Sequence, residues 1–297
     1  GKTFGQLMTW VLDGEKSPET VEIETSKQWR ELVPDQTHYA IWIGHATFLI
    51  NNGDINILTD PIFSRRASPI GFAGPKRMIP PAMRLNDLPK IDAVVISHNH
   101  YDHFDIWSLK KLSKLNPETV FIVPAGDQKR LIKAGVKNVI EMRWWESLDI
   151  SNTTFHFTPV QHWSKRGLFD RNKSLWGGWF MQTDQLALYH AGDTGYSNDF
   201  KATYERLGAP DYSFIPIGAY DPRWFMKDSH VNPEEAVQIA LDLNTPHSFG
   251  MHWGTFSLTD EPIIEPPIRL KQALKDQNLP PDFFRSPKPG QILQLTK

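Results

Sequence analysis

Residues 92–97 (DAVVIS) run directly into residues 98–103 (HNHYDH), and this junction decides the fold. The first half is a short apolar run, which is typical of a buried strand. The second half places four potential metal ligands within six residues, namely His98, His100, Asp102 and His103. The pattern predicts a metal site at the end of a buried strand.

The four side chains fall into two pairs. Alternate residues of an extended segment point the same way, so His98 and His100 can bind one ion from the end of the strand. As the chain turns into a helix that begins near Asp105, Asp102 and His103 swing towards a second position. Imidazole and carboxylate ligands together suit a divalent transition metal of the zinc type. The alternative is a chance cluster of solvated polar residues.

Composition narrows the chemistry. The chain has 297 residues, 40% of them hydrophobic, which is enough to bury a large core without disulfide or metal staples. A net charge of -2 argues against a dedicated nucleic-acid binder. The chain contains no cysteine and eleven histidines, which excludes disulfides, cysteine nucleophiles and thiolate zinc sites. Any metal must therefore bind His, Asp or Glu.

Short strands and helices alternate along the chain. The predicted strands are 39–43, 47–51, 55–59, 92–97, 120–123, 139–142, 154–158, 178–182, 186–190, 212–215 and 247–251. The predicted helices are 106–115, 127–134, 200–207, one from Pro233 with Asn232 as its N-cap, and 267–275. Residues 51–54 (NNGD) are typical of a hairpin turn. This order predicts an α/β protein whose two βα-type halves pack sheet against sheet, with helices outside.

We expect residues 1–297 to form a single domain. Residues 1–35 are polar with little periodicity, which predicts an N-terminal arm that wraps the domain. Residues 61–90 are rich in Pro, Gly, Arg and Met, and a loop of this length is usually functional or mobile. We expect this loop to contribute substrate contacts.

Two complete metal sites need more ligands than one segment supplies, and three candidates follow other predicted strands. His162 follows strand 154–158, Asp193 follows strand 186–190, and His252 follows strand 247–251. Gly192 lets the backbone approach closely, so that Asp193 can bridge two ions. Each residue alone is more often a capped or packed side chain, but together they match the number and kind of position that is required.

These motifs resemble the metallo-β-lactamase superfamily, whose hallmark is His-x-His-x-Asp-His followed by a distant His, Asp and His. Within it, the chain is similar to the N-acyl-phosphatidylethanolamine-hydrolysing phospholipase D family and its bacterial relatives. The likeness extends over about residues 42–274, through WIGHATF (42–48), TDPIFS (59–64), SHNHYDH (97–103), QHW (161–163), AGDTG (191–195), HVNPEEA (230–236) and MHWGTF (251–256). The resemblance implies the αβ/βα four-layer sandwich of that superfamily.

The resemblance also implies two Zn²⁺ ions, with other divalent transition metals as alternatives. One ion would bind His98, His100, His162 and Asp193. The other would bind Asp102, His103, Asp193 and His252, with Asp193 and a hydroxide as bridges. Two such ions activate water and stabilise charge on a phosphoryl group, so the hydroxide would attack phosphorus in line.

Four further residues extend this site. Lys165 and His230 are candidates for phosphate contacts beside the catalytic ligands, and a surface lysine and a turn histidine are the alternatives. Asp60 resembles the superfamily's support residue, which hydrogen-bonds a ligand or a loop amide without binding metal. His45 lies in a matching motif, but its spacing assigns no role, so a packed core histidine is the favoured interpretation.

The resemblance implies a phosphodiesterase of phospholipase D type that hydrolyses N-acyl-phosphatidylethanolamine or a related phospholipid. A lactonase or other carboxylic ester hydrolase is the alternative, and a silent binding protein is disfavoured by the intact ligand set. We expect a phospholipid or small phosphodiester as partner, with peripheral membrane contact and without nucleic acid. No apolar run reaches the length of a membrane span. We therefore expect a soluble or peripherally membrane-associated protein of the bacterial cytoplasm, with the periplasm as an alternative.

Overall fold

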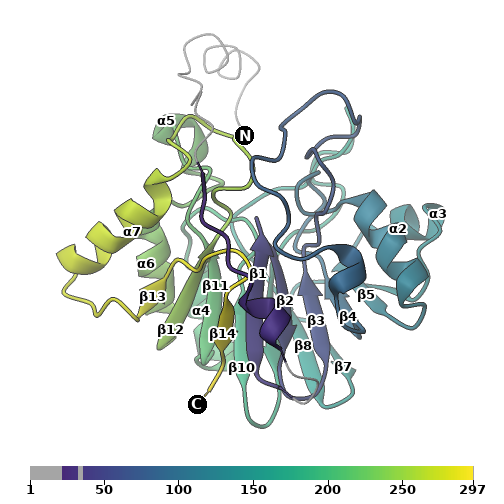
Figure 1. Cartoon of the computed structure of the whole chain (residues 1–297), viewed down its shortest axis with the longest axis horizontal. Coiled ribbons are helices and arrows are strands. Elements are labelled where there is room, and N and C mark those ends of the chain that lie inside the picture. The colour runs from purple at the N-terminus through teal and green to yellow at the C-terminus, as the bar shows by residue number, and fades with distance from the viewer. Residues whose placement is uncertain (1–21, 33–35, 297) are drawn as a thin grey trace.

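Two mixed β-sheets lie face to face, and helices cover their outer faces (Figure 1). The structure is a computed structural model that describes residues 22–32 and 36–296. Each sheet has seven strands. This arrangement is the predicted four-layer αβ/βα sandwich.

The first sheet combines an antiparallel and a parallel half. Its strands, in order across the sheet, are β14 (Ile292–Gln294), β1 (Tyr39–Gly44), β2 (Thr47–Asn51), β3 (Asn56–Thr59), β4 (Ala93–Val95), β5 (Val120–Pro124) and β6 (Val139–Met142). The predicted hairpin joins β2 to β3 and pairs Asn51 with Asn56. From β3 to β6 the strands are parallel. The helices α2 (Ile106–Leu115) and α3 (Gln128–Lys133) cover this half.

The second sheet also combines an antiparallel and a parallel half. Its order is β13 (Phe284–Arg285), β12 (His247–Met251), β11 (Tyr212–Pro216), β10 (Ala187–His190), β9 (Gly178–Gln182), β8 (Thr153–Thr158) and β7 (Ser147–Ile150). Strands β10 to β13 are parallel, and β9 is antiparallel to both β8 and β10. The longer helices of this half are α4 (Asp199–Leu207), α6 (Pro233–Asp242) and α7 (Glu265–Asp276), with the short α5 (Arg223–Met226) before α6.

Strand residues alternate between two apolar clusters. Ala93 and Val95 of β4 belong to the cluster between the sheets, whereas Val94 packs in the cluster beneath α2 and α3. Both faces of β4 are therefore buried, which explains why its sequence is a continuous apolar run. The strand is shorter than predicted, because it ends at Val95 and Ser97 already bonds to Asp60.

Three strands were not predicted from the sequence, β7, β13 and β14, and all three lie at sheet edges. Each has two to four residues, and β7 (SLDI) has no fully buried residue. Edge strands are commonly short and polar, so they carry little apolar signal. The other predicted strands and helices are confirmed to within two residues at each end that was predicted.

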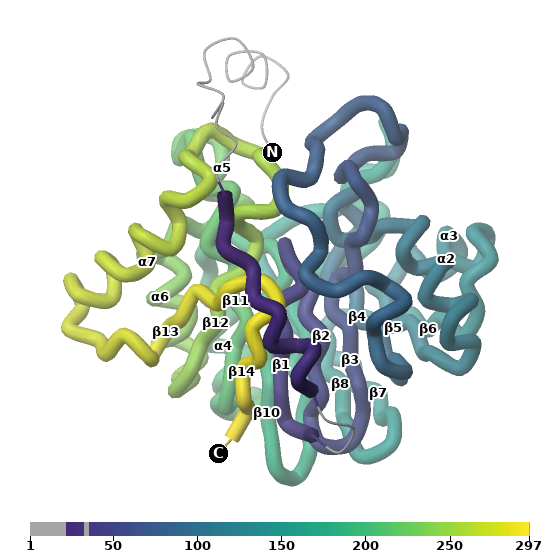
Figure 2. The backbone as a smooth tube through the Cα atoms, in the orientation of Figure 1, coloured from purple at the N-terminus to yellow at the C-terminus, as the bar shows by residue number. Residues whose placement is uncertain are grey.

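The described N-terminal residues run beside the C-terminal segment (Figure 2). Ser26 N donates to Pro289 O, and Trp29 N donates to Gly290 O. The wrapping arm predicted for residues 1–35 lies outside the described residues at 1–21 and 33–35. Among the described residues, no helix is long and apolar enough to cross a membrane.

Candidate metal centre

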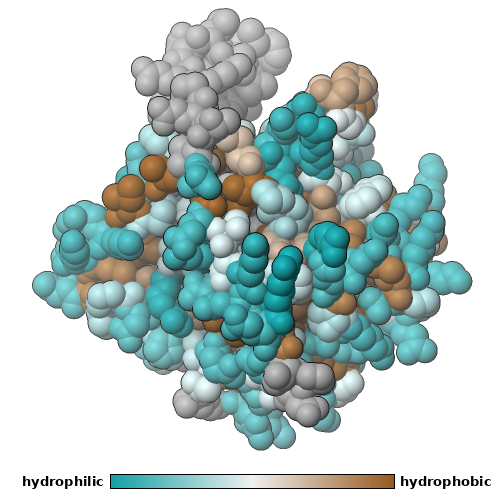
Figure 3. All heavy atoms as spheres, viewed as in Figure 1, coloured by the Kyte–Doolittle hydropathy of each residue, from teal (hydrophilic) through white to brown (hydrophobic). Residues whose placement is uncertain are grey.

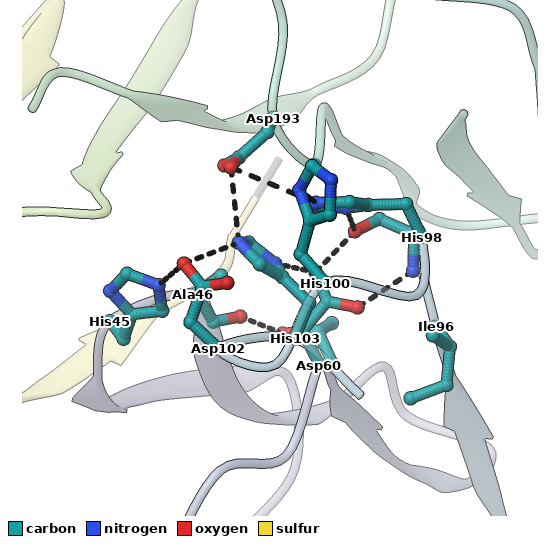
Figure 4. A network of polar contacts seen from close by, with 12 residues as sticks. His45, Ala46, Asp60, Ile96, His98, His100, Asp102, His103 and Asp193 are labelled. Carbon is teal, nitrogen blue, oxygen red and sulfur yellow. Dashed lines mark hydrogen bonds and ion pairs between the residues drawn. The ribbon is translucent and has the colours of Figure 1, made fainter. Parts of the chain in front are cut away.

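The predicted ligands all follow strands that end at one edge of the sandwich. Because β8 and β10 are both antiparallel to β9, they run in the same direction, and β12 is parallel to β10 through β11. The loops after these strands therefore meet at one edge. They carry His162 after β8, Asp193 after β10 and His252 after β12. The HNHYDH segment occupies the loop between β4 and α2 on the facing sheet (Figure 4).

Three histidines, His98, His100 and His162, form the first set of candidate ligands. His98 Nε2 lies 2.8 Å from His100 Nδ1, which lies 3.2 Å from His162 Nε2. Asp193 Oδ2 lies 3.8 Å from His98 Nε2 and 3.9 Å from His162 Nε2. Ligand atoms of a tetrahedral zinc site lie about 3.3 Å apart, because Zn–N bonds measure about 2.0–2.1 Å. The spacing of this set fits one such ion.

The second set of candidate ligands, Asp102, His103 and His252, also contacts Asp193. His252 Nε2 lies 3.1 Å from Asp193 Oδ1 and 3.4 Å from Asp102 Oδ2. His103 Nε2 lies 3.2 Å from Asp193 Oδ2 and 3.5 Å from Asp102 Oδ2. Asp193 is 2% exposed and is shared by both sets, so it is placed to bridge two ions.

Neighbouring groups orient two of the imidazoles so that their Nε2 atoms face the cluster. Asp60 Oδ2 accepts from His103 Nδ1 at 2.8 Å, and Ser229 O accepts from His162 Nδ1 at 2.9 Å. A carboxylate or carbonyl can only accept, so each Nδ1 carries a proton and each Nε2 is the nitrogen that faces the cluster. His103 Nε2, His252 Nε2 and Asp193 Oδ1 are buried without a hydrogen-bond partner. Buried polar atoms are rarely left unpaired, so this donor set fits metal ions.

Burial and neighbouring charges shift the pKa values of the clustered side chains in different directions. Burial lowers the pKa of His98 and His162 well below its usual range. Burial also opposes a charge on His252, but Asp193 and Asp102 outweigh it and raise the pKa to about 9. Burial likewise opposes ionisation of Asp102 and Asp193, yet the adjacent imidazoles hold the pKa of both carboxyls well below its usual range. Both carboxylates are therefore ionised at neutral pH.

Asp60 has the supporting contacts that the sequence predicted. Its Oδ1 accepts from Ser97 N at 2.7 Å, and its Oδ2 accepts from Ser97 Oγ at 2.7 Å as well as from His103. Ser97 Oγ in turn lies 2.9 Å from His98 Nδ1. One fully buried carboxylate thus orients a residue of each ligand set.

Of the two residues predicted to contact phosphate, His230 reaches the cluster and Lys165 makes no polar contact with it within the described residues. His230 Nδ1 lies 3.9 Å from Asp193 Oδ2 and is buried without a hydrogen-bond partner, so this imidazole reaches the cluster. No hydrogen bond or ion pair within the described part of the chain joins Lys165 to the ligands. Its role stays a prediction.

His45 was interpreted as a packed core histidine, but the structure corrects this, because the buried imidazole contacts a residue of the cluster. His45 Nε2 lies 2.9 Å from Asp102 Oδ2, and the residue is 1% exposed. Because the carboxylate can only accept, His45 Nε2 carries the proton and cannot bind metal through that atom. His45 therefore orients Asp102. The WIGHATF motif was the available signal, but the partner lies 57 residues away.

Arg166 also supports the cluster, and no motif in the sequence points to this residue. Its Nη1 donates to Asn99 O at 3.0 Å and to Phe104 O at 2.8 Å, and its guanidinium lies over the Tyr101 ring. Burial lowers its pKa to about 10, so the side chain is still charged at neutral pH. Arg166 therefore holds both ends of the loop that carries the first four ligands.

Comparison with known proteins agrees with this architecture. The family model described as a beta-lactamase superfamily domain matches residues 55–253. The chain is 42% identical over 247 residues to N-acyl-phosphatidylethanolamine-hydrolyzing phospholipase D 1 of Caenorhabditis elegans, covering 80% of this chain and 69% of the relative. It is 28% identical over 258 residues to a UPF0173 metal-dependent hydrolase of Caldivirga maquilingensis, covering 86% and 98%.

Solved structures give the same fold. A possible metal-dependent hydrolase from Veillonella parvula superposes with a TM-score of 0.70 at 18% identity, covering 88% of this chain and 100% of that one. Igni18, a metallo hydrolase from Ignicoccus hospitalis, gives 0.65 at 22% identity, covering 86% and 97%. At these identities the likeness concerns the fold.

Proposed function

Because this chain belongs to the beta-lactamase superfamily and is a metal-dependent hydrolase, we propose that it hydrolyses a phospholipid phosphodiester at two Zn²⁺ ions. The proposed substrate is N-acyl-phosphatidylethanolamine or a related phospholipid, cleaved on the headgroup side in the phospholipase D manner. The name of the Caenorhabditis elegans relative supports this substrate class. The observation that carries the proposal is the pair of ligand sets that share Asp193.

The ligand sets divide between the two ions as their distances suggest. His98, His100 and His162 would hold one ion, and Asp102, His103 and His252 the other, with Asp193 on both. Bound there, two divalent ions would supply an activated water nucleophile and positive charge against the phosphoryl oxygens. The chain's own residues set the positions of these donors.

His230 is placed to act on the substrate. It lies beside Asp193 and two residues before Asn232, the N-cap of α6, whose capping box fixes the start of the helix at Pro233. Arg223 Nη1 donates to His230 O at 2.8 Å, which holds the backbone of this residue. We propose that the imidazole donates a hydrogen bond to a phosphoryl oxygen of the bound substrate.

One sample can test the proposal by metal analysis combined with turnover of three substrates. After zinc reconstitution we expect two zinc ions per chain and hydrolysis of both a chromogenic phosphodiester and N-acyl-phosphatidylethanolamine. Turnover of an acyl lactone alone would instead support a carboxylic ester hydrolase. A purified, folded chain that binds no zinc would contradict the proposal.

The proposed bridging role of the Asp193 carboxylate gives a sharper prediction. Asp193→Asn removes the charge shared by both ligand sets, so phosphodiester turnover should fall at least ~1000-fold, since metal ions supply several kcal/mol of transition-state stabilisation. The matched control is Asp184→Asn, at an exposed position between β9 and β10, which should keep its activity. Near-normal turnover of Asp193→Asn with confirmed zinc content would rule out the bridging role.

A further inference from the structure

A large cavity lies beside the ligand loop, between residues 64–71 and α2. It has a volume of about 800 Å³. Its charged lining is strongly one-sided: Asp105 is the acidic residue, and the basic residues are Arg65, Arg66, Lys110, Lys111, Lys114 and Arg166. The chain as a whole carries a net charge of -2, so this excess of cations is local. A concentration of one charge sign on one face indicates an anionic partner.

The single carboxylate of the lining is engaged in local structure. Asp105 Oδ1 accepts from Trp107 N as the N-cap of α2, while Oδ2 accepts from Ser64 N and Ser108 Oγ. By contrast, Lys110, Lys111 and Lys114 are exposed on α2. Their ammonium groups are therefore available to an anion in solution or on a surface.

Exposed apolar side chains accompany this basic cavity. Phe72, Leu168 and Phe169 are 83%, 83% and 85% exposed, the highest values among the large apolar residues in the described part of the chain. An antiparallel β-bridge joins the backbones of Arg66 and Lys76. The segment between them therefore folds back, and Phe72 lies near its tip. Leu168 and Phe169 follow Arg166, which lines the same cavity. Figure 3 shows hydrophobic side chains at the tip of the upper-right projection, with hydrophilic ones below.

The cavity adjoins the metal centre through Tyr101. This residue lies between the ligands His100 and Asp102, lines the cavity, and donates its hydroxyl proton to Arg166 O at 2.7 Å. A molecule held at the cavity is therefore next to the ligand loop. The arrangement places a cationic surface beside the loop that carries four of the candidate ligands.

We propose that this docking face, formed by Phe72, Leu168 and Phe169 with the lysines of α2, binds the surface of an anionic phospholipid bilayer. The apolar side chains would enter the interface, and the lysines would contact lipid phosphates and carboxylates. The inference rests on the proposed function, because it presents a phospholipid headgroup to the metal centre. Exposed Leu and Phe at loop tips favour a bilayer over a nucleic acid, which offers no apolar interior.

Co-sedimentation of the zinc-loaded protein with vesicles tests the docking face, because it measures binding and does not depend on substrate turnover. The probes are vesicles of phosphatidylcholine alone and of phosphatidylcholine mixed with phosphatidylglycerol. We expect binding to the anionic vesicles only, weakened by added salt. Lys110→Gln/Lys114→Gln should lower the partition coefficient roughly 25-fold, since each basic residue near an anionic surface contributes about fivefold.

The chain offers matched controls on α7, on the opposite side of the molecule from α2 (Figure 1). Lys271→Gln/Lys275→Gln removes two exposed lysines with the same helical spacing and should leave binding unchanged. Leu168→Ser/Phe169→Ser should lower binding at least tenfold, whereas Ile268→Ser, at an exposed position on α7, should not. Each variant should hydrolyse a soluble chromogenic phosphodiester at the unaltered rate, which separates failure of docking from failure of the proposed function.

Three results would overturn the proposal. The first is equal binding to neutral and anionic vesicles, and the second is an equal loss of binding in the α7 control. The third is absence of vesicle binding together with a gel shift of a single-stranded oligonucleotide that Lys110→Gln/Lys114→Gln abolishes. That result would assign the lysines to nucleic acid instead.

Discussion

At the scale of single residues, the protonation of each imidazole decides what it can bind. His103 and His162 donate through Nδ1 to oxygen acceptors, which leaves Nε2 free to face the cluster. His45 does the reverse, because its Nε2 donates to Asp102. Two kinds of histidine therefore lie within one cluster, candidate ligands and a residue that orients a candidate ligand.

The role of His45 can be tested by its removal. His45→Gln should lower affinity for the ion held by Asp102 by about 10–100-fold, the usual effect of losing a group that orients a metal ligand. Competition with a chromogenic chelator measures this affinity. His156→Gln, on β8 and outside the cluster, is the control. Unchanged zinc affinity in a folded His45→Gln protein would assign His45 to core packing.

At the scale of elements, the start of α6 fixes the segment that carries His230. Asn232 Oδ1 accepts from Glu235 N at 2.9 Å, and Glu235 Oε2 accepts from Arg223 Nη2 at 2.7 Å. Arg223 also holds His230 O. The helix cap and the site are thus connected by a single guanidinium.

Removal of this cap has a predictable cost. Asn232→Ala should lower the free energy of unfolding by about 1 kcal/mol, because the Glu235 amide loses its acceptor. Asn198 is a matched control, since it is the N-cap of α4 without a side-chain capping bond, and Asn198→Ala should cost less. Urea titrations of the metal-free proteins measure both values. Equal losses in the two variants would contradict the capping role.

At the scale of the whole molecule, the candidate ligands join the two sheets. Four ligands follow β4 in the first sheet, and the other three follow β8, β10 and β12 in the second. Ions bound between them would link the two halves of the sandwich. Metal binding should therefore stabilise the entire fold rather than one loop.

Removal of metal tests this link. A metal ion present at about 1000 times its Kd stabilises the folded state by about 4 kcal/mol. For a chain of this size, chelation should then lower the thermal midpoint by roughly 10 °C. Differential scanning fluorimetry with a chelator, followed by added zinc, measures the loss and its recovery. The His252→Ala variant should show a smaller shift, and identical midpoints with and without chelator would exclude the effect.

The separation along the chain between two interacting residues explains which contacts could be predicted from the sequence. The HNHYDH loop, the hairpin at residues 51–54 and the cap of α6 depend on neighbours in the chain, so their signals are local. The contact between His45 and Asp102 and the contacts of Arg166 join segments 57 or more residues apart. The edge strands β7, β13 and β14 depend on pairing partners rather than on their own composition.

The sequence by itself determined the layered α/β fold and the residue types of the candidate metal centre. Alternation of short apolar runs with amphipathic segments, and closely spaced His and Asp after strands, are properties of the chain alone. Only the tertiary structure decided that His45 orients Asp102, that Arg166 holds the HNHYDH loop, and that cations line the cavity beside Tyr101. The physical reason is that strand direction and sheet packing determine which loops meet at one edge, and no local pattern contains that information.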